Sequence, residues 1–159
     1  DRVGRYGVPL RIVKLRTMVS DAEDLEKYLT SEQLEQWHKE HKVDNDPRVT
    51  TVGRFLRRTS LDEIPQFLNV LLGQMSVIGP RPVEPDELKA YGKSVAEFLS
   101  VTPGITGWWQ VKARNNACYD GGERQHLELE YVQDRSLIRD AEVFIETFSA
   151  MFGKQRSGR

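Results

Sequence analysis

Two adjacent carboxylates, Asp62 and Glu63, lie where the basic residues of the sequence are dense. Arg57 and Arg58 precede them, and Arg81 follows between two prolines that restrict the backbone on both sides of it. Guanidinium groups bind phosphate oxygens through paired hydrogen bonds, so these arginines are candidates for holding a phosphorylated substrate. The combination predicts phosphoryl-group chemistry on a diphosphate-type substrate.

A carboxylate pair repels a bare phosphate, so a divalent cation would be needed to bring Asp62 and Glu63 together with a diphosphate. Magnesium is the ordinary choice, because it binds through one or two carboxylates together with substrate phosphates. The acids then have two possible roles, which are to hold the metal and to attack phosphorus as a nucleophile. Lys14 and Arg114 are further candidate phosphate ligands if the fold brings them to the same place.

A structural interpretation of the same residues stays open. Ser60 and Glu63 match a capping box, in which Ser60 is the N-cap of a helix and the Glu63 side chain returns to the Ser60 backbone N–H. Asp62 would then be one more first-turn acid, and Arg57 and Arg58 would form a solvated face. The sequence contains no G-x-x-x-x-G-K-S/T motif, which excludes a P-loop NTPase.

Composition excludes several classes of protein. The chain has 159 residues, with 23 Lys and Arg against 24 Asp and Glu, so it lacks the overall positive charge of a nucleic-acid binder. Its single cysteine, Cys118, excludes an internal disulfide and a cysteine-rich zinc site, and it fits a reducing, cytoplasmic setting. No apolar run is long enough to span a bilayer. Because the chain opens on Asp1 without a methionine, we expect a fragment of a longer protein.

The hydrophobic pattern predicts a single α+β domain over residues 1–159, mostly helical, with a small N-terminal β-hairpin or sheet. A hairpin over 3–18 would turn at Tyr6-Gly7, and residues 10–16 would form its second strand. A twisted parallel sheet is not expected, because few strand-like runs alternate with the helices. Helices are predicted over 21–42, from about 61 to 72, over 84–99 and 123–133, and from 136 onward.

Several apolar positions have a predicted environment. Helical spacing predicts that Ile64, Phe67, Leu68, Leu71 and Leu72 belong to the core. The wide apolar stripe of the last helix predicts core packing, with docking on a membrane surface as the alternative, aided by Lys154, Arg156 and Arg159.

The adjacent Trp108 and Trp109 can both face one core only if the backbone is irregular. Either both are packed, or one of them faces a ligand or a membrane interface, where tryptophan is favoured. The sequence leaves both possibilities open.

Several motifs in a fixed order carry a resemblance to a known family. They are VKLRTM at 13–18, DPRVT at 46–50, RRTSLDEIPQ at 57–66, IGPRP at 78–82 and PGITG at 103–107. In this arrangement the chain resembles the bacterial sugar transferases, which are monotopic phosphoglycosyl transferases, from about Arg2 to the last helix. Residues 112–122 depart from the usual Gly-Arg pattern of that family.

The resemblance implies a polyprenyl-phosphate sugar-1-phosphate transferase. Such an enzyme moves a sugar-1-phosphate from a nucleotide-diphosphate sugar, usually a UDP-sugar, to polyprenyl phosphate and so initiates exopolysaccharide or glycoconjugate synthesis. It implies a covalent phosphosugar on Asp62, Mg²⁺ held by Asp62 and Glu63, and substrate phosphates bound by Arg57, Arg81, Lys14 and Arg114. The implied setting is the cytoplasmic face of the bacterial inner membrane, with an N-terminal membrane segment that this chain lacks.

Two other functions remain as alternatives. One is a non-catalytic domain of the same shape that binds a nucleotide sugar or a membrane partner. The other is a nucleic-acid binder that uses Trp108, Trp109 and the arginines, and the balanced charge of the chain disfavours it.

Overall fold

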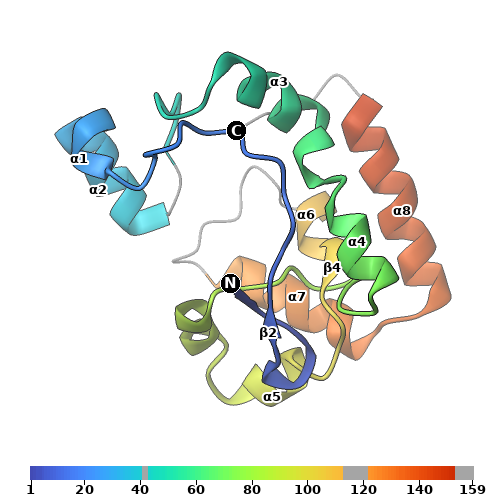
Figure 1. The fold of residues 1–159 in the computed structure, drawn as a ribbon. Helices are drawn as coiled ribbons and strands as arrows, with labels where there is room; N and C mark the ends of the chain where they lie inside the picture. The colour runs from blue at the N-terminus through green and yellow to red at the C-terminus, as the bar shows by residue number, and fades with distance from the viewer. Residues whose placement is uncertain (41–42, 113–121, 153–159) are drawn as a thin grey trace.

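The computed structural model describes residues 1–40, 43–112 and 122–152 (Figure 1). The chain is mainly helical, and short strands and 3₁₀ helices (η) lie between its α-helices. The elements in chain order are β1 (Arg2–Val3), η1 (Arg5–Gly7), β2 (Pro9–Leu10), α1 (Leu25–Tyr28), α2 (Ser31–Glu40), α3 (Thr51–Thr59), η2 (Leu61–Glu63), α4 (Gln66–Leu71), β3 (Ser76–Ile78), η3 (Pro85–Ser94), α5 (Val95–Phe98), β4 (Gly104–Thr106), α6 (Trp108–Lys112), α7 (Glu123–Gln133) and α8 (Leu137–Phe152).

The N-terminal hairpin is present, and it turns where the sequence predicted. β1 and β2 pair antiparallel, and Tyr6 and Gly7 both adopt positive φ in the turn between them. The predicted strand over 10–16 is wrong beyond Leu10, because the following residues run extended without a strand partner. A bridge between Val3 and Val83 attaches the hairpin to the middle of the chain.

The predicted long helix over 21–42 is two helices. Asp24 caps α1 by accepting a hydrogen bond from the Lys27 backbone N–H, so the first helix begins at Leu25 and not at Asp21. The predictions of α7 and of the terminal helix α8 are confirmed to within one residue at their described ends. The fold class is also confirmed, since the chain is mostly helical with a small antiparallel sheet at its N-terminus.

A second small sheet pairs β3 and β4 in parallel, with Ser76 opposite Gly104 and Ile78 opposite Thr106. The backbones meet closely beyond this sheet, because a Cβ added to Gly104 would lie 2.1 Å from the Gly79 nitrogen. Only glycine allows such an approach. The sheet thereby holds the Gly-Pro-Arg-Pro segment in place at its end.

The core lies mainly on the C-terminal side of the chain. Trp108, Tyr131 and Val143 form one buried cluster, and Val83, Tyr91 and Phe98 form another. Trp109 is also buried, so both tryptophans are packed, which selects the first of the two possibilities left open by the sequence. In the described part of the chain, no helix combines the length and the apolar composition that crossing a bilayer requires.

The predicted core face of α4 is wrong. Its apolar side chains are exposed, with Leu71 at 82% and Leu72 at 72% of their full accessible surface. The buried side of the same helix is polar instead, since Gln66 and Asn69 are 3% and 2% exposed. The helical period was correct, but the face that it marks points outward.

Candidate active site

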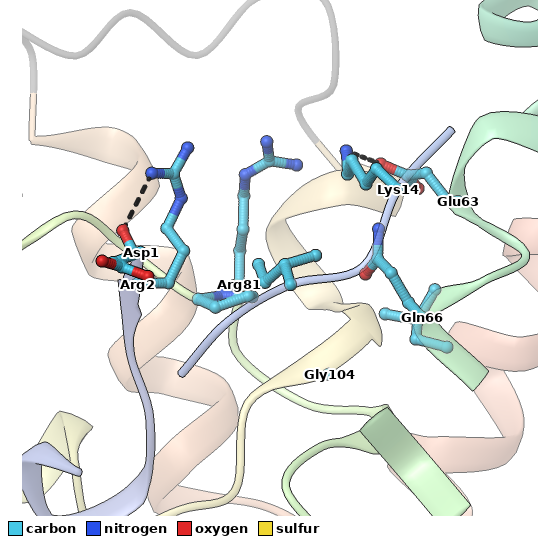
Figure 2. Close-up of a pocket in the computed structure, with 10 residues that line it drawn as sticks. Asp1, Arg2, Lys14, Glu63, Gln66, Arg81 and Gly104 are labelled. Atoms are coloured by element: carbon cyan, nitrogen blue, oxygen red, sulfur yellow. Dashed lines mark hydrogen bonds and ion pairs between the residues drawn. The ribbon is translucent and has the colours of Figure 1, made fainter. Parts of the chain in front are cut away.

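A pocket of about 230 Å³ lies where the hairpin, the extended segment after it, the η2–α4 turn and the Gly-Pro-Arg-Pro segment meet (Figure 2). Its polar lining consists of Asp1, Arg2, Lys14, Glu63, Gln66 and Arg81. These side chains come from segments far apart in the sequence, and their charges are mixed. The pocket is therefore a site where cations and carboxylates can act on one ligand.

Hydrogen bonds to the extended segment set the position of Lys14. The buried Asn69 accepts from the Val13 backbone N–H at 3.2 Å and donates to the Arg11 carbonyl at 2.8 Å. The Leu15 backbone N–H donates to the Asp62 carbonyl at 3.0 Å. With the segment held on both sides of it, the Lys14 ammonium lies 2.7 Å from the Glu63 carboxylate.

Asp62 lies in a short 3₁₀ turn between α3 and α4 and is only 9% exposed. Ser60 ends α3 in the left-handed conformation, with φ of 57°, and makes no side-chain cap hydrogen bond. The predicted Ser60–Glu63 capping box is therefore wrong, and the Glu63 side chain pairs with Lys14 instead. The sharp turn keeps Asp62 largely out of bulk water. Its neighbour Glu63 lines the pocket.

Arg81 is held by its backbone. Its N–H donates to the carboxyl group of Glu128 on α7, at 3.0 Å and 3.3 Å to the two oxygens. Pro80 and Pro82, both buried, restrict the chain on either side. The guanidinium of Arg81 thus extends into the pocket from a rigid base, and no ion pair to it is found among the described residues.

Glu128 is fully buried, and burial raises its pKa from 4.5 to about 8. The hydrogen bond from the Arg81 backbone and the charges of Arg124 and Arg81 act in the opposite direction without overcoming burial. Arg124 is itself buried and pairs with Glu87 at 3.2 Å. The backbone of Arg81 is therefore hydrogen-bonded to a buried carboxyl group that favours its protonated form.

Glu128 predicts a specific pH dependence of stability. Because its folded pKa lies above its unfolded value, its stabilising contribution is complete below about pH 4.5 and is lost as the pH rises toward about 8. We expect the free energy of unfolding of the wild type to fall relative to that of Glu128→Gln by on the order of 5 kcal/mol across this range. Denaturant titrations at several pH values measure this difference.

The exposed Glu123 on the same helix supplies the matched control for that experiment. Glu123→Gln should follow the wild-type pH dependence. Parallel pH curves for the wild type and Glu128→Gln would contradict the assignment of a raised pKa to Glu128.

Arg57, also a predicted phosphate ligand, lies outside the lining of this pocket. Its Nε donates to Thr17 Oγ1 at 2.9 Å, and Arg57 is not among the residues that line the pocket. Backbone hydrogen bonds between 17–19 and 48–50 hold this region, and α3 fits closely there, since a Cβ on Gly53 would lie 1.9 Å from the Thr17 carbonyl oxygen. In this structure Arg57 stabilises the position of Thr17, three residues after Lys14.

The structure thus brings three of the predicted site residues into one pocket, namely Lys14, Glu63 and Arg81. Asp62 adjoins this group without lining the pocket. Arg114 and Cys118 lie outside the described residues.

Sequence reasoning missed Arg2, Gln66 and Glu128. For Glu128 a signal existed, because it lies on the inward face of α7, three residues before the buried Tyr131. A glutamate at such a position needs a partner. No comparable local signal marked Arg2.

The donor atoms at the turn fit magnesium only with help from a substrate. Asp62 and Glu63 supply hard oxygen ligands, but no group of three or more potential metal-binding side chains is found among the described residues. Magnesium is often bound by one or two carboxylates that are completed by water and substrate phosphates. The residues present fit that arrangement and do not form a self-sufficient metal site.

Taken together, a carboxylate pair at a buried turn and a cationic pocket beside it define a candidate phosphate-processing site. The family model of the bacterial sugar transferases matches residues 1–154. The chain therefore belongs to the bacterial sugar transferase family.

Relatives whose names state an activity or a pathway are similar along nearly the whole chain. It is 43% identical over 150 residues to the undecaprenyl-phosphate galactose phosphotransferase of Salmonella typhimurium, covering 92% of this chain and 31% of the relative. It is 40% identical over 153 residues to the exopolysaccharide production protein ExoY of Rhizobium meliloti, covering 94% of this chain and 67% of the relative. It is 37% identical over 160 residues to the UDP-glucose:undecaprenyl-phosphate glucose-1-phosphate transferase of Escherichia coli, covering 96% and 32%. The chain thus spans about a third of the length of several of its relatives.

Proposed function

We propose that the protein transfers a sugar-1-phosphate from a nucleotide-diphosphate sugar, most simply a UDP-sugar, to a polyprenyl phosphate. The observation that carries this proposal is the meeting of Lys14, Glu63 and Arg81 in one pocket next to the buried Asp62. The names of the relatives that act on undecaprenyl phosphate support the choice of acceptor. The product would begin the assembly of an exopolysaccharide or glycoconjugate.

The proposed reaction has two steps. In the first, an Asp62 carboxylate oxygen attacks the phosphorus that carries the sugar, and the bond from that phosphorus to the bridging oxygen breaks, so a nucleoside monophosphate leaves. In the second, an oxygen of the polyprenyl phosphate attacks the same phosphorus and releases the Asp62 carboxylate. Lys14 and Arg81 would bind the phosphate oxygens in both steps, with fixed positive charge where negative charge develops.

Mg²⁺ is the proposed cofactor, held by Asp62 and Glu63 together with substrate phosphates. When bound, it would neutralise the repulsion between the carboxylates and the diphosphate. Lys14 already neutralises part of the Glu63 charge at 2.7 Å, which keeps an anionic ligand compatible with this end of the pocket. Arg114, outside the described residues, stays a candidate phosphate ligand.

A transfer assay tests the proposed function. The complete gene product, in detergent or membranes, is given a series of UDP-sugars, polyprenyl phosphate and Mg²⁺, and release of uridine monophosphate is measured. We expect release with one of the sugars and a loss of at least about 10²-fold when EDTA removes the metal, with recovery on adding Mg²⁺. Tight binding of a UDP-sugar with no release under any of these conditions would favour a non-catalytic binding domain.

The exposed side of α4 supports a membrane surface as the site of action. We propose that this side contacts the bilayer, with the exposed apolar residues of α8 as a second contact. Both helices pack against β3 and lie on the right-hand side of the view in Figure 1. The exposed residues of the α4 region are Ile64, Phe67, Leu68, Leu71 and Leu72. Because α4 begins three residues after Glu63, a lipid-anchored phosphate would approach the site from this side.

Vesicle binding tests the membrane contact. We expect the 159-residue chain with Leu71→Gln and Leu72→Gln to bind phosphatidylglycerol-containing vesicles at least about 10-fold more weakly than the wild type, because two leucines no longer enter the interface. Val8→Gln, which alters an exposed apolar residue of the N-terminal hairpin, is the matched control and should bind normally. Equal binding by all three proteins would exclude α4 as the contact.

A further inference from the structure

Arg2 lines the same pocket as Arg81, although 78 residues separate them in the chain. The Val3–Val83 bridge brings the two segments together, since Arg2 immediately precedes Val3 and Arg81 lies two residues before Val83. Figure 2 shows the two guanidinium groups extended toward the same side of the pocket, with the Lys14–Glu63 pair beyond Arg81. The cations therefore form a row in the order Arg2, Arg81, Lys14.

Like charges in such a row repel one another, so the fold must hold them there. The Arg2 guanidinium is 2.6 Å from the Glu84 carboxylate, which neutralises part of its charge, and it donates to the Asp1 carbonyl at 3.3 Å. Within the described residues, no carboxylate pairs with the Arg81 side chain that lies between the other two cations. A row of cations with an unbalanced charge at its centre is complementary to a ligand with adjacent anionic groups.

The two ends of the row differ. The Lys14–Glu63 end contains the chain neighbour of Asp62, since Glu63 directly follows Asp62 in η2. Arg2 lies at the opposite end of the row, beyond Arg81 (Figure 2). A diphosphate lying along the row would therefore have one phosphate near the proposed nucleophile and the other between two guanidinium groups. Paired guanidiniums offer several N–H donors to one phosphate and stabilise the charge that collects on it when it leaves.

We propose that Arg2 is a phosphate-binding residue, which together with Arg81 clamps the departing phosphate of the nucleotide-diphosphate donor. The inference rests on the proposed function for the identity of that donor. It assigns the Lys14 end of the pocket to the phosphate that carries the sugar, and the Arg2 end to the phosphate of the nucleoside monophosphate. Arg2 then acts in binding and in leaving-group stabilisation, while Glu84 orients Arg2 and neutralises part of its charge without contacting the ligand.

Calorimetric titration with inorganic pyrophosphate tests the clamp without requiring turnover. We expect Arg2→Gln in the complete gene product to weaken pyrophosphate binding by about 10-fold to 100-fold, and Arg2→Lys to weaken it less, because lysine keeps the charge but loses the fork. Arg5→Gln is the matched control in the same hairpin. The Arg5 guanidinium donates to the Ser100 carbonyl at 2.8 Å, away from the pocket, so binding should change less than about 2-fold.

A further variant separates binding from a purely structural role. If Arg2 serves only to pair with Glu84, then Glu84→Gln should reproduce the defect of Arg2→Gln, and the proposal fails. If Arg2 contacts the ligand, Glu84→Gln should retain most of the pyrophosphate affinity. Thermal unfolding of each variant shows whether it is folded, and pyrophosphate binding by folded Arg2→Gln that equals that of Arg5→Gln would overturn the proposal.

Steady-state kinetics distinguish the donor from the lipid acceptor as the source of the phosphate. A clamp on the donor predicts that Arg2→Gln raises the KM for the nucleotide sugar and lowers kcat, while the KM for polyprenyl phosphate stays unchanged. A rise confined to the KM for polyprenyl phosphate would overturn the assignment to the departing phosphate. If neither the wild type nor any variant shows transfer, the proposed function fails. The pyrophosphate titration still decides whether Arg2 and Arg81 bind phosphate together.

Discussion

Replacing Asp62 by asparagine should reduce the release of nucleoside monophosphate by the complete gene product by at least about 10³-fold. Asparagine has nearly the shape of aspartate but lacks the carboxylate charge and cannot form the acyl phosphate. Because the turn is held through the Asp62 backbone carbonyl, which accepts from Leu15 N–H at 3.0 Å, the substitution should leave the fold intact. Release assays under saturating donor, acceptor and Mg²⁺ measure the effect.

A trapping experiment makes the Asp62 test more direct. With donor labelled in the sugar and no acceptor, the wild type should acquire covalent label, and Asp62→Asn should acquire none. Asp86→Asn is the control, because the Asp86 carboxylate is exposed and pairs with Lys89 at 2.8 Å. This variant should acquire label as the wild type does. Turnover retained by Asp62→Asn would remove Asp62 as the nucleophile, and label retained on it would place the covalent bond on another residue.

Replacing Arg81 by glutamine should lower kcat/KM for the nucleotide sugar by about 10²-fold to 10³-fold, the loss expected when one charged donor is removed from a developing oxyanion. The expected loss is large because Arg81 lies between the other cations of the pocket (Figure 2). Arg81→Lys should lie between the wild type and Arg81→Gln, since an ammonium cannot reproduce paired N–H donors. Initial-rate measurements over a range of donor concentrations provide these values.

A loss of kcat/KM in Arg81→Gln should not arise from misfolding. The hydrogen bond to Glu128 comes from the Arg81 backbone N–H, at 3.0 Å, and survives any side-chain replacement. Thermal unfolding temperatures of the wild type and Arg81→Gln should therefore be similar. Arg135→Gln, at an exposed position between α7 and α8, removes the same charge away from the pocket and should retain wild-type kcat/KM. A folded Arg81→Gln with normal kcat/KM would contradict the proposed role.

The region around α4 shows how far sequence patterns could predict this molecule. The spacing of Ile64, Phe67, Leu68 and Leu71 identified a helical apolar face, but the structure exposes it and buries Asn69 instead. A period indicates which residues share a face and does not indicate what covers that face. The capping box at Ser60 failed for a related reason, because Lys14, distant in sequence, competes for the Glu63 carboxylate.

The C-terminal helices were easier to predict. In α7, the helix itself was predicted and Tyr131 is buried at 3% exposure, but the burial of Arg124 and Glu128 in the same helix was not expected. Apolar spacing finds an inward face, whereas a buried charge depends on a partner from another segment. Here the partners are Glu87 for Arg124 and the Arg81 backbone for Glu128.

The sequence by itself determined the features that depend on neighbouring residues. These are the adjacent acids Asp62 and Glu63, the arginine held between Pro80 and Pro82, and the helices α7 and α8, because residue type, local spacing and backbone restriction suffice to establish them. The tertiary structure decided which charges meet. Arg2, Lys14 and Arg81 share a pocket because backbone hydrogen bonds to Asn69, Asp62 and Val83 join distant segments, and because Gly79 and Gly104 permit a backbone contact that side chains would block.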